Sequence, residues 1–218
     1  MNLRSKFSEN DLNRIKAAVH EAESKISGEI VPVIVSKSGH YTIANYKASV
    51  VAGAFTFLLL IIFDRYVPTL AIYDRDPLLI FFTVASAGAL AALATHYIHP
   101  LKRLLIEQKH KDNATRQRAE NAFLEEEVFN TRQRTGIMIF ISFLEHEVIV
   151  MADTGISKVV DQREWDKIVI NLTDFIRRDK IVEGLEGALK RCGEILLEKG
   201  FVKTPDDINE LRDDLRIN

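Results

Sequence analysis

The chain has 218 residues, of which 47% are hydrophobic, and its 29 basic and 31 acidic residues leave a formal net charge of −2. Its one cysteine, Cys192, excludes a disulfide within the chain and lies at an apolar helical position, so we predict a buried thiol in a reducing compartment. Residues 1–10 are polar, and we therefore expect no cleavable signal peptide.

The N-terminal segment predicts one amphipathic helix followed by one strand. Ser8 can cap the helix, and Gly28 can end it by adopting a left-handed conformation. The apolar stripe of this helix consists of Leu12, Ile15, Val19, Ala22 and Ile26. Residues 29–36 are apolar on both faces of the predicted strand, which indicates helices on two sides of a sheet. Pro32 lacks an N–H group, so we expect an edge strand or a backbone position that faces outward.

Two uncharged apolar runs follow, at residues 48–63 and 77–97. The first would be about 24 Å long as a helix and is short for a hydrocarbon core of ~30 Å, so we expect Tyr46 and Tyr66 to anchor it at the interfaces. The second run, at residues 77–97, is long enough as a helix to cross the hydrocarbon core. Because neither run contains a charge, a membrane anchor is favoured over an ion pathway, and over two buried core helices.

Basic residues near the apolar runs predict the orientation. Two of them lie in the loop between the runs, and the loop also carries Asp64, Asp74 and Asp76. Six lie on the other side: Lys37, Lys47, Lys102, Arg103, Lys109 and Lys111. We predict an integral protein of a bacterial inner membrane, and the positive-inside rule places its soluble domain and both termini in the cytoplasm, or in the matrix or stroma if the protein belongs to an organelle.

Residues 101–134 are rich in helix-forming charged residues and predict a long helix. We expect its first part to be a solvated stalk and its later part, with Ala119, Ala122 and Phe123, to dock on the sheet. Acidic residues are interleaved with the basic ones along this helix, so we expect no nucleic-acid partner.

The C-terminal half predicts two strands and two helices. The strands span residues 137–143 and 148–152 and are joined by so short a turn that they must be antiparallel. Asp161 can cap a helix that carries Trp165, and a last helix carries Cys192 and stops at Gly200. The acidic residues after position 203 have little to bury, and we expect them to be loosely attached.

Together these elements predict an α/β fold, a three-layer helix-sheet-helix soluble domain with a small mixed sheet. The domain would be discontinuous and would comprise residues 1–46 and 101–204. A two-helix transmembrane hairpin at residues 47–98, with spans at about 47–66 and 77–97, would interrupt it, and an acidic tail at residues 205–218 would follow.

In this order and spacing, several phrases of the soluble part resemble the TPM-domain family. They cover most of residues 7–46 and 115–215 and include residues 27–31, 131–137, 153–156 and 205–207, together with the helix of Trp165. Within the family, the chain resembles the bacterial TPM-domain membrane proteins. The chain departs from the pattern of soluble members at residues 4–7, where a Val-Asp pair is absent, and at Pro32.

The resemblance implies a three-layer α/β domain and two kinds of activity. Some family members are weak acid phosphatases or calcium binders, and others assist the assembly, repair or modulation of membrane complexes. A phosphatase would need a nucleophile or a metal cluster with cationic phosphate clamps, and we find no glycine-rich phosphate loop and no Cys-x5-Arg arrangement in the sequence.

The best candidate site is Asp153 with Gly155, because a carboxylate that leaves a strand before a glycine is typical of ligand sites in α/β folds. Glu29 and Asp161 could approach it, and several such oxygens would suit calcium. The alternative is that Asp153 and Asp161 only cap a turn and a helix.

We therefore predict a membrane-anchored, non-catalytic interaction module that assists the assembly or maintenance of a membrane protein complex. Its partners would be the bilayer and another membrane protein, bound through the soluble domain or through the hairpin itself. The alternative is a weak membrane-bound acid phosphatase or metal-dependent hydrolase of the TPM type.

Overall fold

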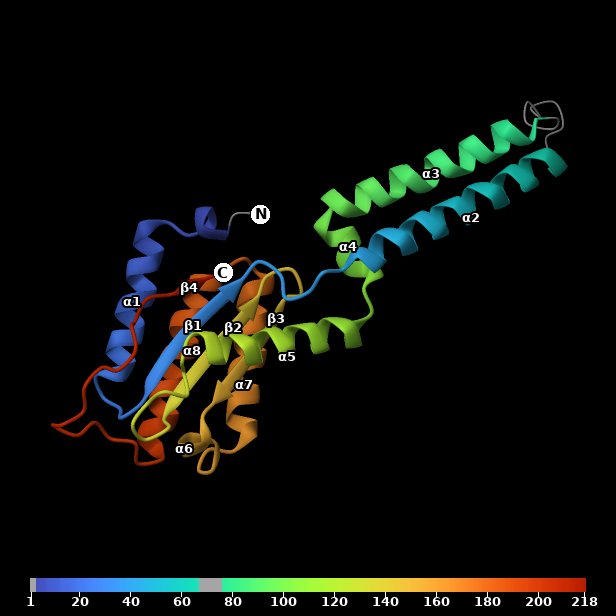
Figure 1. Ribbon diagram of the computed structural model, residues 1–218. Helices are drawn as coiled ribbons and strands as arrows, with labels where there is room; N and C mark the ends of the chain where they lie inside the picture. The colour runs from blue at the N-terminus through green and yellow to red at the C-terminus, as the bar shows by residue number, and fades with distance from the viewer. Residues whose placement is uncertain (1–2, 67–75) are drawn as a thin grey trace. The chain divides into compact units, whose positions relative to one another are not determined.

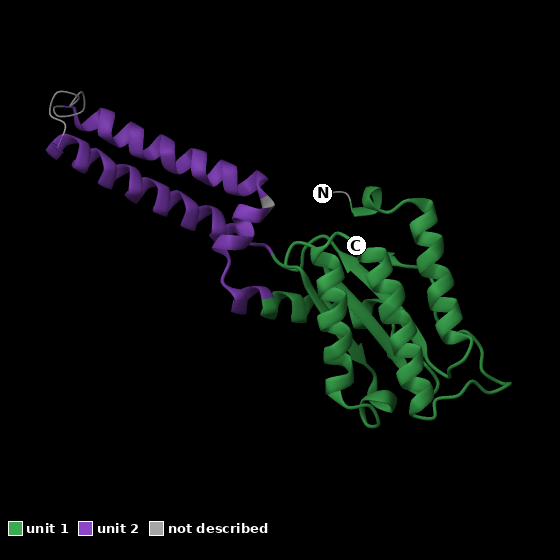
Figure 2. Cartoon of the chain, turned by 180° about the vertical axis from the view of Figure 1, so that it is seen from behind, with its two compact units in different colours: residues 1–39, 112–218 green, residues 40–111 purple. Residues whose placement is uncertain are grey.

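The computed structural model describes residues 3–66 and 76–218, without the side chain of His99. It divides into two compact units (Figure 2). Unit 1 comprises Met1–Gly39 and Asp112–Asn218, and unit 2 comprises His40–Lys111. Asp74 and Arg75 of the predicted loop lie outside the described residues.

Unit 1 is a mixed α/β structure built on a four-stranded sheet in the order β3-β2-β1-β4 (Figure 1). Strand β1 (Glu29–Val35) runs parallel to β2 (Gly136–Ser142), and β2 pairs antiparallel with β3 (Glu147–Ala152) as predicted. The register pairs Glu29 with Gly136 and Ile137 with Ala152. The start of β1, the start of β2 and the end of β3 therefore meet at one end of the sheet.

Both faces of this sheet are apolar and buried, in two separate clusters. The first cluster contains Ile30, Ile34 and Ile139 together with residues of α1 (Glu9–Glu23), α7 (Gln162–Arg177) and α8 (Ile181–Glu198). The second contains Val33 and Phe140 with residues of α5 (Gln108–Glu125). The run of apolar residues in β1 is thus explained by burial on two sides.

The C-terminal segment differs from the expectation of a loose acidic tail. Its last residues form β4 (Arg216–Ile217), which pairs parallel with Val33 and Ile34 of β1. Arg216 is buried and forms ion pairs with Glu126 and Asp214, at 2.9 and 3.2 Å. The tail completes the sheet because β1, an apolar strand, has a free edge that needs hydrogen-bond partners.

Pro32 consequently lies in an inner strand and not at an edge. On the side of β1 that faces β4, the N–H of Ile30 donates to the Glu23 carboxylate at 2.8 Å, and the N–H of Ser36 donates to the main-chain oxygen of Asn218 at 3.2 Å. Pro32 falls on this same side, before β4 begins at Arg216. No strand is paired with this side of β1 at Pro32, so the absence of an N–H group there costs no hydrogen bond between strands. This agrees with the predicted alternative of an outward-facing backbone position.

The predicted long helix after the hairpin is interrupted. Helix α4 (His99–Leu105) ends at Ile106, which has an extended backbone, and α5 begins only at Gln108. Helix α5 then ends at Glu125 and not near residue 134. Glu127 and Arg134 both have left-handed φ angles, 53° and 57°, so the chain turns twice before β2.

Unit 2 consists of α2 (Thr42–Tyr66) and α3 (Pro77–Tyr97), followed by α4. Helices α2 and α3 are long and apolar enough to cross a membrane, and only 6% and 11% of their apolar windows are buried. At 25 residues α2 exceeds the predicted apolar run and includes both Tyr46 and Tyr66. The two helices pack through Gly88, where an added Cβ would lie 2.9 Å from the Ser49 hydroxyl.

Candidate functional site

Asp153 leaves β3 and caps the four-residue helix α6 (Thr154–Ser157). Its Oδ1 accepts a hydrogen bond from the N–H of Thr154 at 2.6 Å, and the residue is only 4% exposed. This is the cap predicted as the alternative to a ligand site.

Arg134 neutralises this buried carboxylate. Its Nε lies 2.7 Å from Oδ2 of Asp153, and its Nη2 donates to Oδ1 at 3.1 Å. Only the contact to Oδ1 has hydrogen-bond geometry, since Oδ2 of Asp153 has no hydrogen-bond partner among the described residues, but the short distances still make this a close ion pair. A cation bound at Asp153 would have to displace Arg134, which disfavours a calcium ion there.

The predicted strand pairing placed Arg134 near Asp153 but did not show that the two side chains pair. The antiparallel arrangement of β2 and β3 brings the residues before β2 next to those after β3, and the N–H of Asp153 donates to the main-chain oxygen of Gly136 at 2.9 Å. The basic residue nearest to this junction is Arg134. Sequence reasoning used residues 131–137 for a family resemblance and missed this charge.

Gly155 is required by the same junction. Its N–H donates to the main-chain oxygen of Arg134 at 2.9 Å. A Cβ at this position would lie 2.6 Å from the carbonyl oxygens of Gln133 and Arg134, which is too close for any side chain. The glycine thus permits a close backbone approach.

Asp161 caps α7 at the surface. It accepts the N–H of Arg163 at 2.9 Å, and the Arg163 guanidinium lies 2.9 Å from its other oxygen. Hydrogen bonds from the side chain and backbone of Arg163 lower the pKa of Asp161 to about 2. Its partners are therefore local, and the structure shows no hydrogen bond or ion pair that joins Asp161 to Asp153 among the described residues.

Glu29 begins β1 and holds the C-terminal segment. Its buried carboxylate accepts the N–H groups of Glu210 and Leu211 at 3.0 and 3.3 Å, and burial raises its pKa. The register places Glu29 and Asp153 on opposite sides of Gly136, about two strand spacings or ~10 Å apart along the sheet. The two predicted carboxylates thus share one end of the sheet, but each has partners of its own.

Glu23, at the end of α1, is a buried carboxylate that sequence reasoning missed. It is 6% exposed, and burial raises its pKa to about 8 against an ordinary value of 4.5. One oxygen accepts the N–H of Ile30, and the other has no hydrogen-bond partner among the described residues. Glu23 follows Val19 by one helical turn, so the buried stripe of α1 was the available signal.

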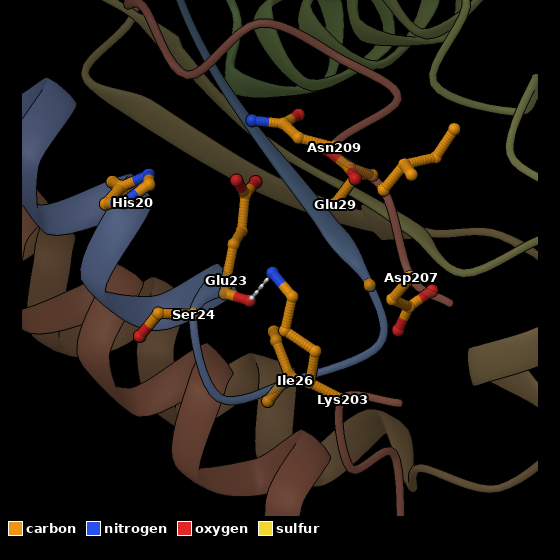
Figure 3. A pocket seen from close by; sticks show the side chains of 10 residues that line it. His20, Glu23, Ser24, Ile26, Glu29, Lys203, Asp207 and Asn209 are labelled. Atoms are coloured by element: carbon orange, nitrogen blue, oxygen red, sulfur yellow. Dashed lines mark hydrogen bonds between the residues drawn. The ribbon is translucent and has the colours of Figure 1, made fainter. Parts of the chain in front are cut away.

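A small cavity opens beside Glu23 (Figure 3). Its volume is about 50 Å³, and its lining includes His20, Glu23, Glu29, Lys203, Asp207 and Asn209. Lys203 donates to the main-chain oxygen of Glu23 at 3.1 Å. The cavity can hold ordered water and is far smaller than a substrate pocket. In the described part of the chain, no three His, Cys, Asp or Glu side chains gather in a way that could hold a metal ion.

At the opposite end of the sheet another buried carboxylate, Glu145, holds the loop that leaves β1. Its oxygens accept the N–H of Ser38 at 3.0 Å and the hydroxyl of Ser142, and the Ser38 hydroxyl donates to Ser142 at 2.7 Å. The network satisfies the polar groups at the carboxyl ends of β1 and β2. It holds residue 38 in unit 1, just before the chain enters the hairpin.

Comparison with known proteins gives one result, a fold. No protein-family model and no curated protein matches the chain. The NMR structure of the BA42 protein from the psychrophilic bacterium Bizionia argentinensis is similar, with a TM-score of 0.59 and 16% sequence identity over 97% of this chain and 95% of that chain. At this identity the similarity concerns the fold alone.

Proposed function

We propose that the chain is a membrane-anchored, non-catalytic interaction module that assists the assembly or maintenance of a membrane protein complex. The observation that carries this proposal is an exposed apolar hairpin inserted between two paired strands of an otherwise ordinary α/β unit.

The hairpin supports membrane anchoring. Helices α2 and α3 expose large apolar side chains that include Phe55, Phe81 and Leu90, each more than half exposed. Contiguous apolar surface of this size is not stable in water but is satisfied by lipid. The α/β unit would then be tethered to the bilayer by the segments at residues 36–41 and 106–107.

The position of the hairpin in the chain, between β1 and β2, supports a role that depends on the membrane. Strand β1 ends at Val35 and its parallel partner β2 begins at Gly136, so the sheet closes only after the chain has passed through the hairpin. Folding of the domain is thereby coupled to insertion of the hairpin. Such a module would present its binding surface only when it is in the membrane.

The carboxylates support interaction over hydrolysis. Asp153 is paired with Arg134, Asp161 caps α7, and Glu29 holds the backbone of the C-terminal segment. Each group has a structural partner that a catalytic role would have to break.

We also propose that unit 1 is a three-layer domain of the TPM type. Two buried clusters, one on each face of the sheet, support the layers. The phrases that resemble the family also lie together: the N–H of Glu29 donates to Thr135, Gly155 approaches Arg134, and Asp207 lines the same cavity as Glu29. These contacts support the proposal, because segments that are separate in the sequence but resemble one family lie next to one another in the fold.

Replacing the hairpin tests the proposal. Residues 42–97 would be exchanged for an unrelated two-helix hairpin of equal length, and partners would be purified with both proteins from detergent-solubilised membranes. We expect the same partners with either hairpin, because the α/β unit does the recognising. Loss of all partners with the foreign hairpin would assign recognition to α2 and α3.

The orientation is tested by labelling with a membrane-impermeant maleimide. The natural Cys192 is buried, so a single added cysteine reports its own side of the membrane. We expect Tyr66→Cys to react in intact cells and Lys158→Cys to react only after lysis. The reverse pattern would place the α/β unit outside the cytoplasm.

An assay with an aryl phosphate addresses catalysis directly. We expect the purified protein and its Asp153→Asn variant to hydrolyse the compound at the same background rate. A rate above background that is lost in the variant would contradict the non-catalytic role.

A further inference from the structure

One end of the hairpin carries cations that have no anionic partner. Lys47, Lys102 and Arg103 form no ion pair with any described residue, and no Asp or Glu occurs in residues 40–63 or 77–106. In unit 1, by contrast, arginines such as Arg14, Arg134 and Arg216 are ion-paired. Glu107, the acidic residue that follows along the chain, pairs with His110 at 3.8 Å, so these three cations have no ion-pair partner among the described residues.

Helix α4 brings these cations to one end of the hairpin. It follows the break at Ile98, contacts both α2 and α3, and lies beside the beginning of α2, where Lys47 occupies the second turn (Figure 1). Lys102 and Arg103 come from the middle of α4. All three positions are thus at the end of the hairpin where α2 begins and α3 ends.

The same end carries the apolar and aromatic groups typical of a membrane interface. Tyr46 and Tyr97 are 72% and 73% exposed, and Leu104, next to Arg103, is 81% exposed. Tyrosine rings favour the headgroup level of a bilayer, and a short segment that exposes both leucine and cations suits the boundary between headgroups and acyl chains.

We propose that this end of the hairpin is a binding surface for anionic phospholipid headgroups, with Lys47, Lys102 and Arg103 contacting the lipid phosphates. The inference rests on the proposed insertion of the hairpin and adds the lipid class. The charge complementarity carries it, because three cations without an ion-pair partner suit a negatively charged leaflet. A guanidinium can bind a phosphate through two parallel hydrogen bonds, and each cation near a negative surface increases partitioning by about fivefold.

The test measures which lipid stays bound to the full chain. Protein in mild detergent is mixed with equal amounts of phosphatidylglycerol and phosphatidylcholine, and retained lipids are counted by native mass spectrometry. We expect a clear excess of phosphatidylglycerol, reduced at least fivefold in the double variant K102Q/R103Q, with a smaller reduction for Lys47→Gln.

Arg65→Gln is the matched control. It removes one cation from the opposite end of the hairpin and should leave the lipid ratio unchanged, whereas Arg103→Gln should lower it. Equal retention of both lipids by the natural protein, or an equal effect of Arg65→Gln and Arg103→Gln, would overturn the proposal. Displacement of phosphatidylglycerol by millimolar inorganic phosphate would also overturn it, since the site would then bind free phosphate.

Resistance of the protein to extraction by alkaline carbonate separates the two proposals. A chain that resists extraction but retains both lipids equally refutes only the lipid preference. A chain that is extracted is not inserted, which refutes both the anchor and the lipid surface.

Discussion

The two units of this protein place similar residues in opposite surroundings. Unit 1 buries its large apolar side chains in two clusters and pairs most of its arginines, whereas unit 2 exposes phenylalanine, leucine and isoleucine along two helices and leaves Lys47, Lys102 and Arg103 unpaired. The exposed apolar side chains of α2 and α3 support the proposed insertion of unit 2 in a membrane, whereas the large apolar side chains of unit 1 are covered by its own helices and sheet.

The largest expected effect comes from comparing the loss of a buried phenylalanine in unit 1 with the loss of an exposed phenylalanine in unit 2. Phe140 is fully buried in β2, and Phe140→Ala should lower the free energy of unfolding of unit 1 by about 3–5 kcal/mol because it removes core contacts and leaves a cavity. Phe81 is 64% exposed in α3, and Phe81→Ala should change this free energy by less than about 0.5 kcal/mol. Fluorescence of the buried Trp165 during chemical unfolding in detergent measures both. Equal losses would show that the two units share one core.

The buried Glu23 should make the stability of unit 1 depend on pH. Its pKa is raised from 4.5 to about 8, so the folded state holds a proton that the unfolded state loses as pH rises above 4.5. Stability is therefore greatest below that pH and falls as pH rises through 8. At about 1.4 kcal/mol per pH unit over the nearly three units between pH 5 and pH 8, the difference between pH 5 and pH 9 is on the order of 4 kcal/mol.

Glu23→Gln isolates this contribution, since glutamine can still accept the N–H of Ile30. Denaturant midpoints at pH 5 and pH 9 should show the variant close to the natural protein at pH 5 and more stable at pH 9. Glu147, whose burial raises its pKa to about 7, is unchanged in both proteins and cancels in the comparison. Parallel pH profiles of the two proteins would contradict a buried neutral Glu23.

The ion pair between Arg134 and Asp153 should also contribute to the stability of unit 1. Arg134→Ala leaves a buried carboxylate without its cation and should cost about 2–3 kcal/mol, less than for a fully buried pair because Arg134 is half exposed. Arg163→Ala, at the exposed pair with Asp161, should have a much smaller effect, because solvent screens this pair. Thermal unfolding in detergent at pH 7 compares them. A negligible loss for Arg134→Ala would reopen Asp153 as a site for another cation.

The smallest expected effect concerns the packing of α2 against α3 within unit 2. An added Cβ at Gly88 meets Ser49 at 2.9 Å, whereas one at Gly53 meets Val84 only at 3.5 Å. Gly88→Ala should therefore weaken the packing of α2 on α3 by about 1 kcal/mol, and Gly53→Ala should not. The loss of helical circular dichroism in rising detergent denaturant measures this. A greater effect at Gly53 would contradict the observed contact.

Several elements could be predicted because their signals are local. The Ser8 cap, the short antiparallel turn before β3 and the uncharged runs of the hairpin follow from neighbouring residues, and the structure has each of them. The predicted end of α1 was wrong, because the helix stops at Glu23, so that Ile26 lies beyond it, and Gly28 does not take the left-handed conformation. For the same reason, the cap by Asp161 was available as an alternative to a ligand site.

The rest depended on partners far apart in the chain. The sequence predicted neither the Arg134 partner of Asp153 nor the burial of Glu23 against the N–H of Ile30. It predicted a loosely attached acidic tail, but Glu29 and the edge of β1 bind this segment. The sequence by itself determined the division into an apolar hairpin and an α/β unit, because composition and periodicity are properties of single segments. Only the tertiary structure decided which carboxylates are paired, since the burial and counter-charge of a carboxylate are set by residues that the chain order does not place beside it.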